Sequence, residues 1–292
     1  MIEITSSTKI TGIMGYPIKH TLSPIMHNRA FSLLNLNYLY AVFPVAPKDL
    51  AQAVMALPAL KIKGVNVTIP FKQDVLKYLD EITPCARRIG AVNTIVNENG
   101  KLIGYNTDGE GFINSLKEVN FETAGKKILL LGAGGACRAV ALSLAWAGAK
   151  KIIVATRNAT KAEKMIKETG LEQEVQTECF FLSSLPSEKI AEADLIVNTT
   201  PLGMAPFEDK MPDIPLEGLH SAQYVCDLIY NPLKTVLLRK ARLKGCKTVN
   251  GIGMLVHQGA KSFYLWTKEK PPIEEMRQAI LKYVGNSRKK LP

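Results

Sequence analysis

Cysteine and histidine are scarce in this chain, whose 292 residues include five cysteines and four histidines. The cysteine count is odd and no pair has the CxxC spacing. The sequence therefore predicts free thiols in a reducing compartment, the cytoplasm, and no disulfide framework. The histidines form neither an HExxH pair nor another ligand spacing, so we expect no metal site.

Long apolar runs are also missing, since no stretch approaches the ~18 residues that a membrane span needs. The first ten residues, MIEITSSTKI, lack the basic and apolar regions of a signal peptide. Apolar residues make up 47% and charged residues 22%, which is the balance of a globular protein. At roughly 150 residues per domain, the length predicts about two domains.

Acidic residues are in the minority: 37 Lys and Arg against 26 Asp and Glu give a net charge of +11. A basic surface is ordinary, but it also attracts a phosphate-bearing cofactor, an acidic substrate or nucleic acid. The basic residues are dense only at residues 288–290 and lack the aromatic interleaving of a nucleic-acid binder. We expect a small-molecule substrate as partner, with no nucleic acid and no membrane, in a monomer or homodimer.

Strand and helix patterns alternate along the first hundred residues. A helix begins at Pro24, and further helices are predicted at residues 49–57 and from Pro70 to about residue 79. The predicted strands are residues 9–14, 38–43, 64–69, 91–96 and 101–105. This alternation indicates an α/β domain with a mostly parallel sheet covered on both faces.

The second half repeats the alternation with crossover helices, which predicts a doubly wound sheet of five or six strands. A helix beginning at Asp108 precedes it, and two helical runs follow Gly253. The predicted strands are residues 127–131, 151–157, 194–200, 224–230 and 246–250.

A glycine turn follows the strand that ends at Leu131 and precedes an apolar helix. Its residues are Gly132, Ala133, Gly134, Gly135 and Ala136. Glycines let the backbone approach a pyrophosphate, and the helix N-terminus offers free N–H groups and the positive end of its dipole. The third glycine of GxGxxG is replaced by Cys137, yet strand, turn and helix together predict a dinucleotide site.

The end of the next strand indicates which dinucleotide binds. An NAD site usually carries Asp or Glu there, but this strand ends in Thr156 and Arg157. The Arg157 guanidinium suits a phosphate dianion, and Lys161 is close enough in sequence to reach the same anion. We therefore predict NADP(H) as cofactor.

Residues 66–72 (NVTIPFK) predict a polar site at the end of a strand. Asn66 and Thr68 share one face of the strand, and Lys72 begins the predicted helix that follows. The helix dipole disfavours an ammonium in that first turn, which would suit a residue that gives and takes protons. Asp108 is interpreted either as a helix cap alone or as the carboxylate that holds Lys72 in place.

Eight segments, in this order along the chain, resemble the motifs of the shikimate dehydrogenase family. They are TLSP (21–24), NVTIPFK (66–72), GAVNT (90–94), NTDG (106–109), GAGGA (132–136), NTTPLGM (198–204), DLIYNP (227–232) and GIGMLVHQ (251–258). The resemblance implies an N-terminal α/β substrate domain and a Rossmann-type domain, with a cleft between them. The implied domains are residues 1–108, joined by the C-terminal helices 253–292, and residues 109–252.

The resemblance also assigns roles to residues. Lys72 would be the catalytic acid and base, with Asp108 as its partner and as a ligand of a substrate hydroxyl. The other substrate-binding residues would be Thr21, Ser23, Thr68, Asn93, Tyr230 and Gln258. The cofactor would contact Gly132, Ala133, Gly134, Gly135, Ala136, Thr156, Arg157, Lys161, Leu228, Gly251 and Met254, the last two near the nicotinamide.

Two positions depart from the family pattern. Thr21 stands where serine is usual, and its methyl group narrows the pocket. The relatives that also accept quinate therefore stay among the candidate functions. Thr156 stands where the cofactor loop usually has asparagine, which affects the adenosine end of the cofactor.

The implied reaction is the reversible reduction of 3-dehydroshikimate to shikimate with NADPH, a step of the shikimate pathway towards chorismate and aromatic amino acids. One alternative is a quinate/shikimate dehydrogenase that uses NAD, although Arg157 disfavours it. Another is a dinucleotide-sensing protein without turnover, although a sensor needs no pair such as Lys72 and Asp108. A nucleic-acid binder would need a clustered basic face.

Overall fold

The computed structural model describes residues 4–18 and 21–288, so Lys289 and Lys290 of the basic run lie outside the described residues. The chain divides into two compact units. Unit 1 consists of residues 1–107 and 256–292, and unit 2 of residues 108–255. Among the described residues, no helix has the length and apolar character needed to cross a membrane.

Unit 1 is built on a six-stranded sheet of the described residues, in the order β2-β1-β3-β5-β6-β4. Its strands are β1 (Lys9–Gly15), β2 (Tyr38–Pro44), β3 (Gly64–Val67), β4 (Glu81–Ile82), β5 (Thr94–Glu98) and β6 (Lys101–Tyr105). Its helices are α1 (Ser23–Leu33), α2 (Leu50–Ala59), α3 (Pro84–Ile89), most of α9 (Ile252–Thr267) and α10 (Ile273–Arg288), with 3₁₀ turns η1 (Pro47–Asp49) and η2 (Asp74–Tyr78).

The sheet of unit 1 is mostly parallel, as predicted, except that β5 pairs antiparallel with both β3 and β6. The reversal occurs at Asn99 and Gly100, which join β5 to β6 with φ of 55° and 96°. Two successive positive φ values match the tight hairpin turn for which Asn-Gly is the usual sequence. The sequence prediction gives no direction for either strand, and this dipeptide is the local signal that sets it.

The predicted helix from Pro70 to residue 79 is wrong. The chain turns after β3, where the Phe71 N–H donates to the Thr68 carbonyl at 2.9 Å, and only the short 3₁₀ turn η2 follows. The Lys72 carbonyl accepts from the Val92 N–H at 2.7 Å. That carbonyl is thus bonded to the segment before β5, and Lys72 does not begin an α-helix.

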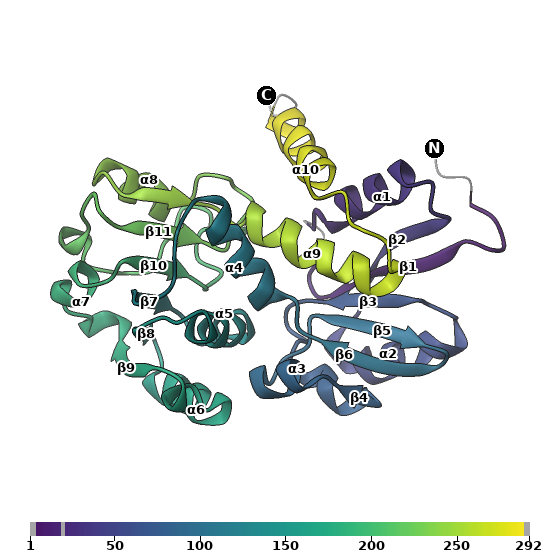
Figure 1. The fold of residues 1–292 in the computed structure, drawn as a ribbon, viewed down its shortest axis with the longest axis horizontal. Coiled ribbons are helices and arrows are strands. Elements are labelled where there is room, and N and C mark those ends of the chain that lie inside the picture. The colour runs from purple at the N-terminus through teal and green to yellow at the C-terminus, as the bar shows by residue number, and fades with distance from the viewer. Residues whose placement is uncertain (1–3, 19–20, 289–292) are drawn as a thin grey trace. The chain divides into compact units, whose positions relative to one another are not determined.

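Helix α9 packs on the sheet of unit 1, where Figure 1 shows it beside β3. The buried Trp266 donates from its indole Nε1 to the Ile95 carbonyl at 3.0 Å. A Cβ on Gly64 would lie 2.2 Å from that nitrogen, so the close approach of helix and sheet needs glycine at this position. Helices α1 and α10 pack against each other.

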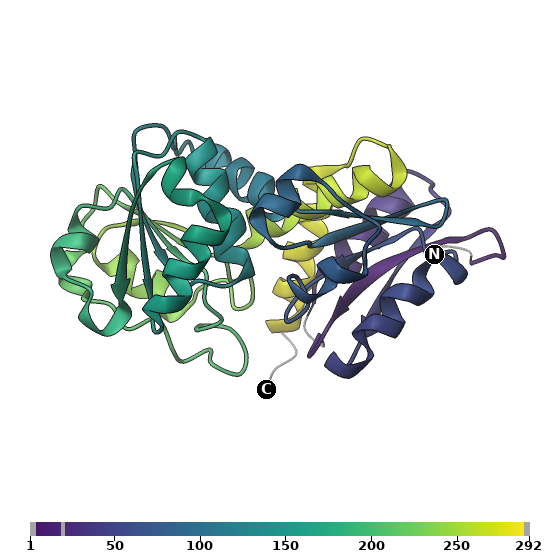
Figure 2. The same cartoon turned by 90° about the horizontal axis from the view of Figure 1, so that it is seen from below.

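Unit 2 has a parallel six-stranded sheet in the order β12-β11-β10-β7-β8-β9. The strands are β7 (Lys127–Leu131), β8 (Lys151–Thr156), β9 (Gln176–Phe181), β10 (Leu195–Asn198), β11 (Tyr224–Asp227) and β12 (Lys247–Val249). The helices are α4 (Asp108–Glu118), α5 (Gly135–Trp146), α6 (Ala159–Thr169), α7 (Ser187–Ala191) and α8 (Val236–Leu243), with 3₁₀ turns η3 (Leu171–Gln173), η4 (Leu182–Ser184) and η5 (Leu216–Gly218). Figure 2 shows helices on both faces of this sheet.

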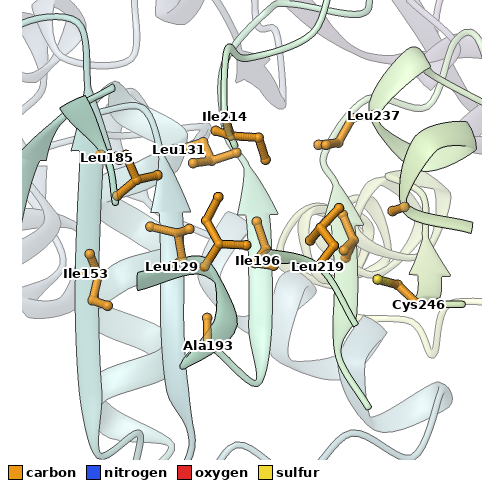
Figure 3. Close-up of a cluster of buried hydrophobic side chains, with 14 of the residues drawn as sticks. Leu129, Leu131, Ile153, Leu185, Ala193, Ile196, Ile214, Leu219, Leu237 and Cys246 are labelled. Carbon is orange, nitrogen blue, oxygen red and sulfur yellow. The ribbon is translucent and has the colours of Figure 1, made fainter. Parts of the chain in front are cut away.

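One face of this sheet forms a buried apolar cluster with α7 and α8. In Figure 3, Leu129, Ile153 and Ile196 project from neighbouring strands toward the helices and loops that cover them. These strands are buried on both faces, which explains their continuous apolar sequence. The prediction of five or six strands holds, although the sequence pattern does not predict β9, whose residues, QTECFF, alternate only weakly.

Candidate active site

The sheet of unit 1 brings its polar segments to one edge. Strands β1, β3 and β6 run in the same direction, so their carboxyl ends meet there. Thr21 and Ser23 follow β1, Thr68 follows β3, and Thr107 follows β6. Asn93 precedes the antiparallel strand β5 and therefore reaches the same edge. Ligands of open α/β sheets bind at such an edge.

The turn before α1 presents two hydroxyl groups. The Ser23 N–H donates to Thr21 Oγ1 at 3.3 Å, and Ser23 is the buried first residue of α1. No side chain caps this helix at Leu22. Hydroxyls beside the positive end of a helix dipole suit the carboxylate of a small substrate.

Thr68 and Lys72 lie on the turn that follows β3, and both are partly buried. The Thr68 N–H donates to the Met14 carbonyl at 2.9 Å, which anchors the turn to β1. The bond between the Lys72 carbonyl and Val92 N–H anchors its other end beside Asn93. Both residues therefore have a fixed main chain at the sheet edge, although the helix-dipole argument for Lys72 no longer applies.

Asn93 is the centre of a buried group of polar side chains. Its Oδ1 accepts from the Thr107 N–H at 2.8 Å, which settles the orientation of the amide. Its Nδ2 donates to Thr107 Oγ1 at 2.9 Å and to Gln258 Oε1 at 3.4 Å. The structure thus brings together Asn93 and Gln258, which are 165 residues apart in the sequence.

Two further buried residues in this region were not among the predicted site residues. Tyr40 donates from its hydroxyl to Asn66 Oδ1 at 2.7 Å. Ser262, on α9, accepts from Asn66 Nδ2 at 2.9 Å. A polar serine within an apolar helix, four residues after Gln258, is the sequence signal that would have pointed to it.

Asp108 and Tyr230 belong to unit 2. Asp108 is a buried residue in the first turn of α4, where the positive end of the helix dipole stabilises a carboxylate. Tyr230 follows β11 and is partly buried, and this burial raises the pKa of its phenol above the usual range.

The glycine turn of unit 2 leaves open space beside the N-terminus of α5. Gly132 has φ of 113°, a conformation open to glycine, and its N–H donates to the Ala155 carbonyl at 2.8 Å. At Gly134, the residue before α5, an added Cβ would find no atom within 4 Å. No side chain caps α5 at this residue. The helix end is therefore open, and its residues fit the pyrophosphate of a dinucleotide.

Cys137, in place of the third glycine, is completely buried. Burial raises the pKa of its thiol to about 12, so it acts as a small apolar residue where α5 packs on the sheet.

The residues after β8 carry the predicted phosphate ligands. Thr156 ends the strand and is buried, whereas Arg157 and Lys161 are exposed. Asn158 caps α6, since its Oδ1 accepts from the Lys161 N–H at 3.1 Å. The two cations thus lie at the start of a capped helix, where they are available to an anion.

The predicted nicotinamide segment joins two parts of unit 2. The Gly251 N–H donates to the Ile229 carbonyl at 2.9 Å, and a Cβ on Gly251 would lie 2.0 Å from the Leu228 carbonyl oxygen. The structure therefore brings Leu228 and Gly251 together, with Met254 buried one turn into α9. This contact leaves no room for any residue other than glycine.

A buried carboxyl supports the loop that bears Leu228 and Tyr230. Asp227 accepts hydrogen bonds from Thr235 Oγ1 at 2.7 Å, Asn198 Nδ2 at 3.1 Å and the Ile229 N–H at 3.1 Å. Burial outweighs these bonds and raises the pKa of Asp227 to about 6.

The fold and these residues define an α/β protein with a Rossmann-type dinucleotide-binding unit and a separate unit that carries a polar site. In the described residues, no group of three His, Cys, Asp or Glu is placed to hold a metal ion.

Comparisons with known proteins agree with this class. Three family models match: the shikimate dehydrogenase substrate binding domain at residues 13–95, shikimate/quinate 5-dehydrogenase at residues 115–211, and the shikimate 5'-dehydrogenase C-terminal domain at residues 251–281. The chain is 48% identical to the shikimate dehydrogenase (NADP(+)) of Carboxydothermus hydrogenoformans over 279 residues, 96% of this chain and 99% of the relative. The chain belongs to the shikimate dehydrogenase family and is an oxidoreductase.

Solved structures agree with the fold. A shikimate dehydrogenase in complex with NADP+ superposes with a TM-score of 0.90 at 44% identity, covering 97% of this chain and 98% of its own. The enzyme from Thermus thermophilus in complex with NADP(H) and shikimate gives 0.84 at 36% identity, covering 94% and 99%. The predicted fold class, a substrate domain together with a Rossmann-type domain, is confirmed.

Proposed function

We propose that this chain reduces 3-dehydroshikimate to shikimate with NADPH, reversibly. One combination of features carries the proposal. The glycine turn before α5 is open, and the chain after β8 has Arg157 but no acidic residue. Membership of the family supports the reaction, because the relatives at this level of identity are named shikimate dehydrogenase (NADP(+)). The substrate is a small molecule, and the cofactor is NADP(H).

We further propose how the residues divide the work. Unit 1 is the substrate-binding domain, and unit 2 holds the cofactor on the turn of Gly132, Ala133, Gly134, Gly135 and Ala136. Thr156, Arg157 and Lys161 hold the adenosine end, and the Arg157 guanidinium matches a phosphate dianion better than an ammonium does. Leu228, Gly251 and Met254 flank the nicotinamide.

The substrate is held by hydroxyls and amides. Thr21 and Ser23 bind its carboxylate at the N-terminus of α1, and Thr68, Asn93 and Gln258 bind the ring hydroxyls, with Tyr230 lining the pocket. Asn93 Oδ1 is already bonded to the Thr107 N–H. Its Nδ2 is bonded to Thr107 Oγ1 at 2.9 Å and to Gln258 Oε1 at 3.4 Å, so a substrate hydroxyl that binds there replaces the longer bond to Gln258.

When bound, NADPH supplies a hydride to the ring carbonyl of the substrate. The carbonyl oxygen gains negative charge in the transition state, and the Lys72 ammonium stabilises this charge and gives its proton to the oxygen. Asp108 is the proposed partner of Lys72 and binds a substrate hydroxyl. In the reverse direction, Lys72 takes the proton back.

The competing functions differ in measurable ways. An NAD-dependent quinate/shikimate dehydrogenase would turn over quinate with NAD, and a dinucleotide sensor would bind cofactor without turnover. Arg157 disfavours the first, and the retention of both Lys72 and Asp108 disfavours the second.

One absorbance assay of nicotinamide reduction, crossing shikimate and quinate with NADP and NAD, tests the proposal. We expect the highest kcat/KM for shikimate with NADP. A higher kcat/KM with NAD would contradict the cofactor assignment, and cofactor binding without turnover of either substrate would contradict the enzyme.

None of the five cysteines, all of which the structure describes, forms a disulfide, and three of them are buried. Free thiols fit a reducing compartment, and we propose the cytoplasm.

A further inference from the structure

Ser262 lies in helix α9, one turn after Gln258, and is completely buried. Its helix neighbours Phe263 and Trp266 are large apolar residues of the core of unit 1. A hydroxyl in such surroundings costs free energy unless hydrogen bonds replace its contacts with water. Its partners therefore show what the hydroxyl contributes to the structure.

The Ser262 hydroxyl bonds to both the helix and the sheet. It donates to the Gln258 carbonyl at 3.0 Å within α9. It accepts from Asn66 Nδ2 of β3 at 2.9 Å and lies 2.8 Å from Thr94 Oγ1 of β5. A single buried oxygen thus joins one turn of α9 to two strands of the sheet.

The orientation of Asn66 is itself constrained. Its Oδ1 accepts from the Tyr40 hydroxyl at 2.7 Å, so its Nδ2 points toward Ser262, Thr94 and the Asn93 carbonyl. All four side chains of Tyr40, Asn66, Thr94 and Ser262 belong to buried residues. Networks that are fully bonded in a low-dielectric interior are rigid.

The two ends of this network are the amides that the proposed function assigns to the substrate. Asn93 directly precedes Thr94, and Gln258 lies one helical turn before Ser262, while the two amides are 3.4 Å apart. The position of Gln258 against Asn93 therefore depends on how α9 is bonded to the sheet at Ser262. A displacement of a binding side chain by about 1 Å is enough to impair how a substrate is held.

We propose that Ser262 is a positioning residue for substrate binding: its hydroxyl holds the Gln258 turn of α9 against β3 and β5. The inference rests on the proposed function, because it takes Asn93 and Gln258 as substrate ligands. Ser262 itself contacts protein groups, and its effect on the substrate passes through Gln258.

The test is the Ser262→Ala variant, with KM for shikimate and for NADP measured separately. The loss of about one neutral hydrogen bond predicts a rise in KM for shikimate of about fivefold, with KM for NADP unchanged. Ser262→Cys keeps the side-chain size but is a weak hydrogen-bond partner, so it should resemble Ser262→Ala. Ser115→Ala is the matched control, because Ser115 is a buried serine whose hydroxyl donates within its own helix, to Phe112.

A double-mutant cycle separates positioning from a general loss of stability. In a Gln258→Ala background, the Ser262→Ala effect on KM for shikimate should vanish. Unchanged KM in Ser262→Ala, or an undiminished effect in the Gln258→Ala background, would overturn the inference while leaving the proposed function intact. A wild-type chain that fails to oxidise shikimate would overturn the proposed function, and this inference with it.

Discussion

The imidazole ring of His27 lies flat against the ring of Tyr40, with centroids 4.4 Å apart and planes 5° from parallel. His27 is completely buried, and neither of its ring nitrogens has a hydrogen-bond partner among the described residues. Burial lowers the pKa of His27 from 6.5 to about 3, so the ring is neutral when folded. Tyr40 donates a hydrogen bond to Asn66, so the packing of the neutral His27 ring against Tyr40 also supports the polar network around Asn66.

The variant His27→Phe should stabilise unit 1, and more so in acid. The unfolded chain protonates His27 below pH 6.5 whereas the folded chain does not, so wild-type stability is lost as the pH falls from 6.5 toward about 3. Phenylalanine removes this loss and the two unpartnered nitrogens. We expect a higher Tm whose gain is larger at about pH 5 than at about pH 8. The same substitution at the exposed His220 is the matched control for replacing an imidazole by a phenyl ring.

The ion network around Glu192 should make unit 2 sensitive to acid. Glu192 contacts Lys151, Lys189 and Lys127 at 3.0, 3.2 and 3.3 Å. Burial alone raises the pKa of Glu192, but the lysine hydrogen bonds outweigh it and bring the pKa down to about 2. The stability from this carboxylate is present above pH 4.5 and is lost as the pH falls toward about 2.

Glu192→Gln should therefore lower Tm at neutral pH by a few degrees, and the deficit should shrink below about pH 4.5. Thermal unfolding over a pH series measures both effects. The exposed Glu172 provides the control, since Glu172→Gln should leave Tm nearly unchanged. A deficit of equal size at every pH would argue for lost packing instead of lost charge.

Lys72→Ala should lower kcat by at least about a hundredfold, because the proposed proton donor of the reaction is removed. The exposed Lys77, five residues away, is the control, and Lys77→Ala should keep normal kcat. Unfolding curves for both variants show whether the fold is retained. Near-normal kcat in folded Lys72→Ala would remove Lys72 from the chemistry.

Arg157→Ala should raise KM for NADP by about tenfold or more, since the proposed charge-assisted bond to the cofactor phosphate is lost. KM for NAD should not rise, because NAD lacks that phosphate. Arg242→Ala is the matched control, because Arg242 is an exposed arginine elsewhere on unit 2. An equal rise in KM for both cofactors would show that the Arg157 guanidinium does not bind the extra phosphate of NADP.

Gly134→Ala separates folding from cofactor binding. An added Cβ meets no protein atom within 4 Å, and φ of −90° suits alanine, so Tm should not fall. The methyl group would nevertheless occupy space that the proposed pyrophosphate needs, and KM for NADP should rise about tenfold. Unchanged KM would show that the phosphates do not approach this glycine. Gly251→Ala should lower Tm instead, since its Cβ collides with the Leu228 carbonyl.

Much of unit 2 could be read from the sequence because its signals are local. The apolar strands, the glycine turn and the Gly170 that ends α6 with φ of 63° depend on neighbouring residues. In unit 1, the local turn at Asn99 and Gly100 sets the direction of β6 against β5. The turn at Lys72 depends instead on a bond to Val92, twenty residues later, which is why a helix was wrongly predicted there.

The sequence by itself determined the α/β class, the glycine turn between β7 and α5 and the absence of an acid after β8, since periodicity and glycine conformation act over a few residues. Only the tertiary structure decided which polar residues meet. Asn93 and Gln258, or Asn66 and Ser262, are joined by strand register and by the packing of α9 on the sheet. Those contacts span 165 and 196 residues, and no local pattern encodes a partner at such a distance.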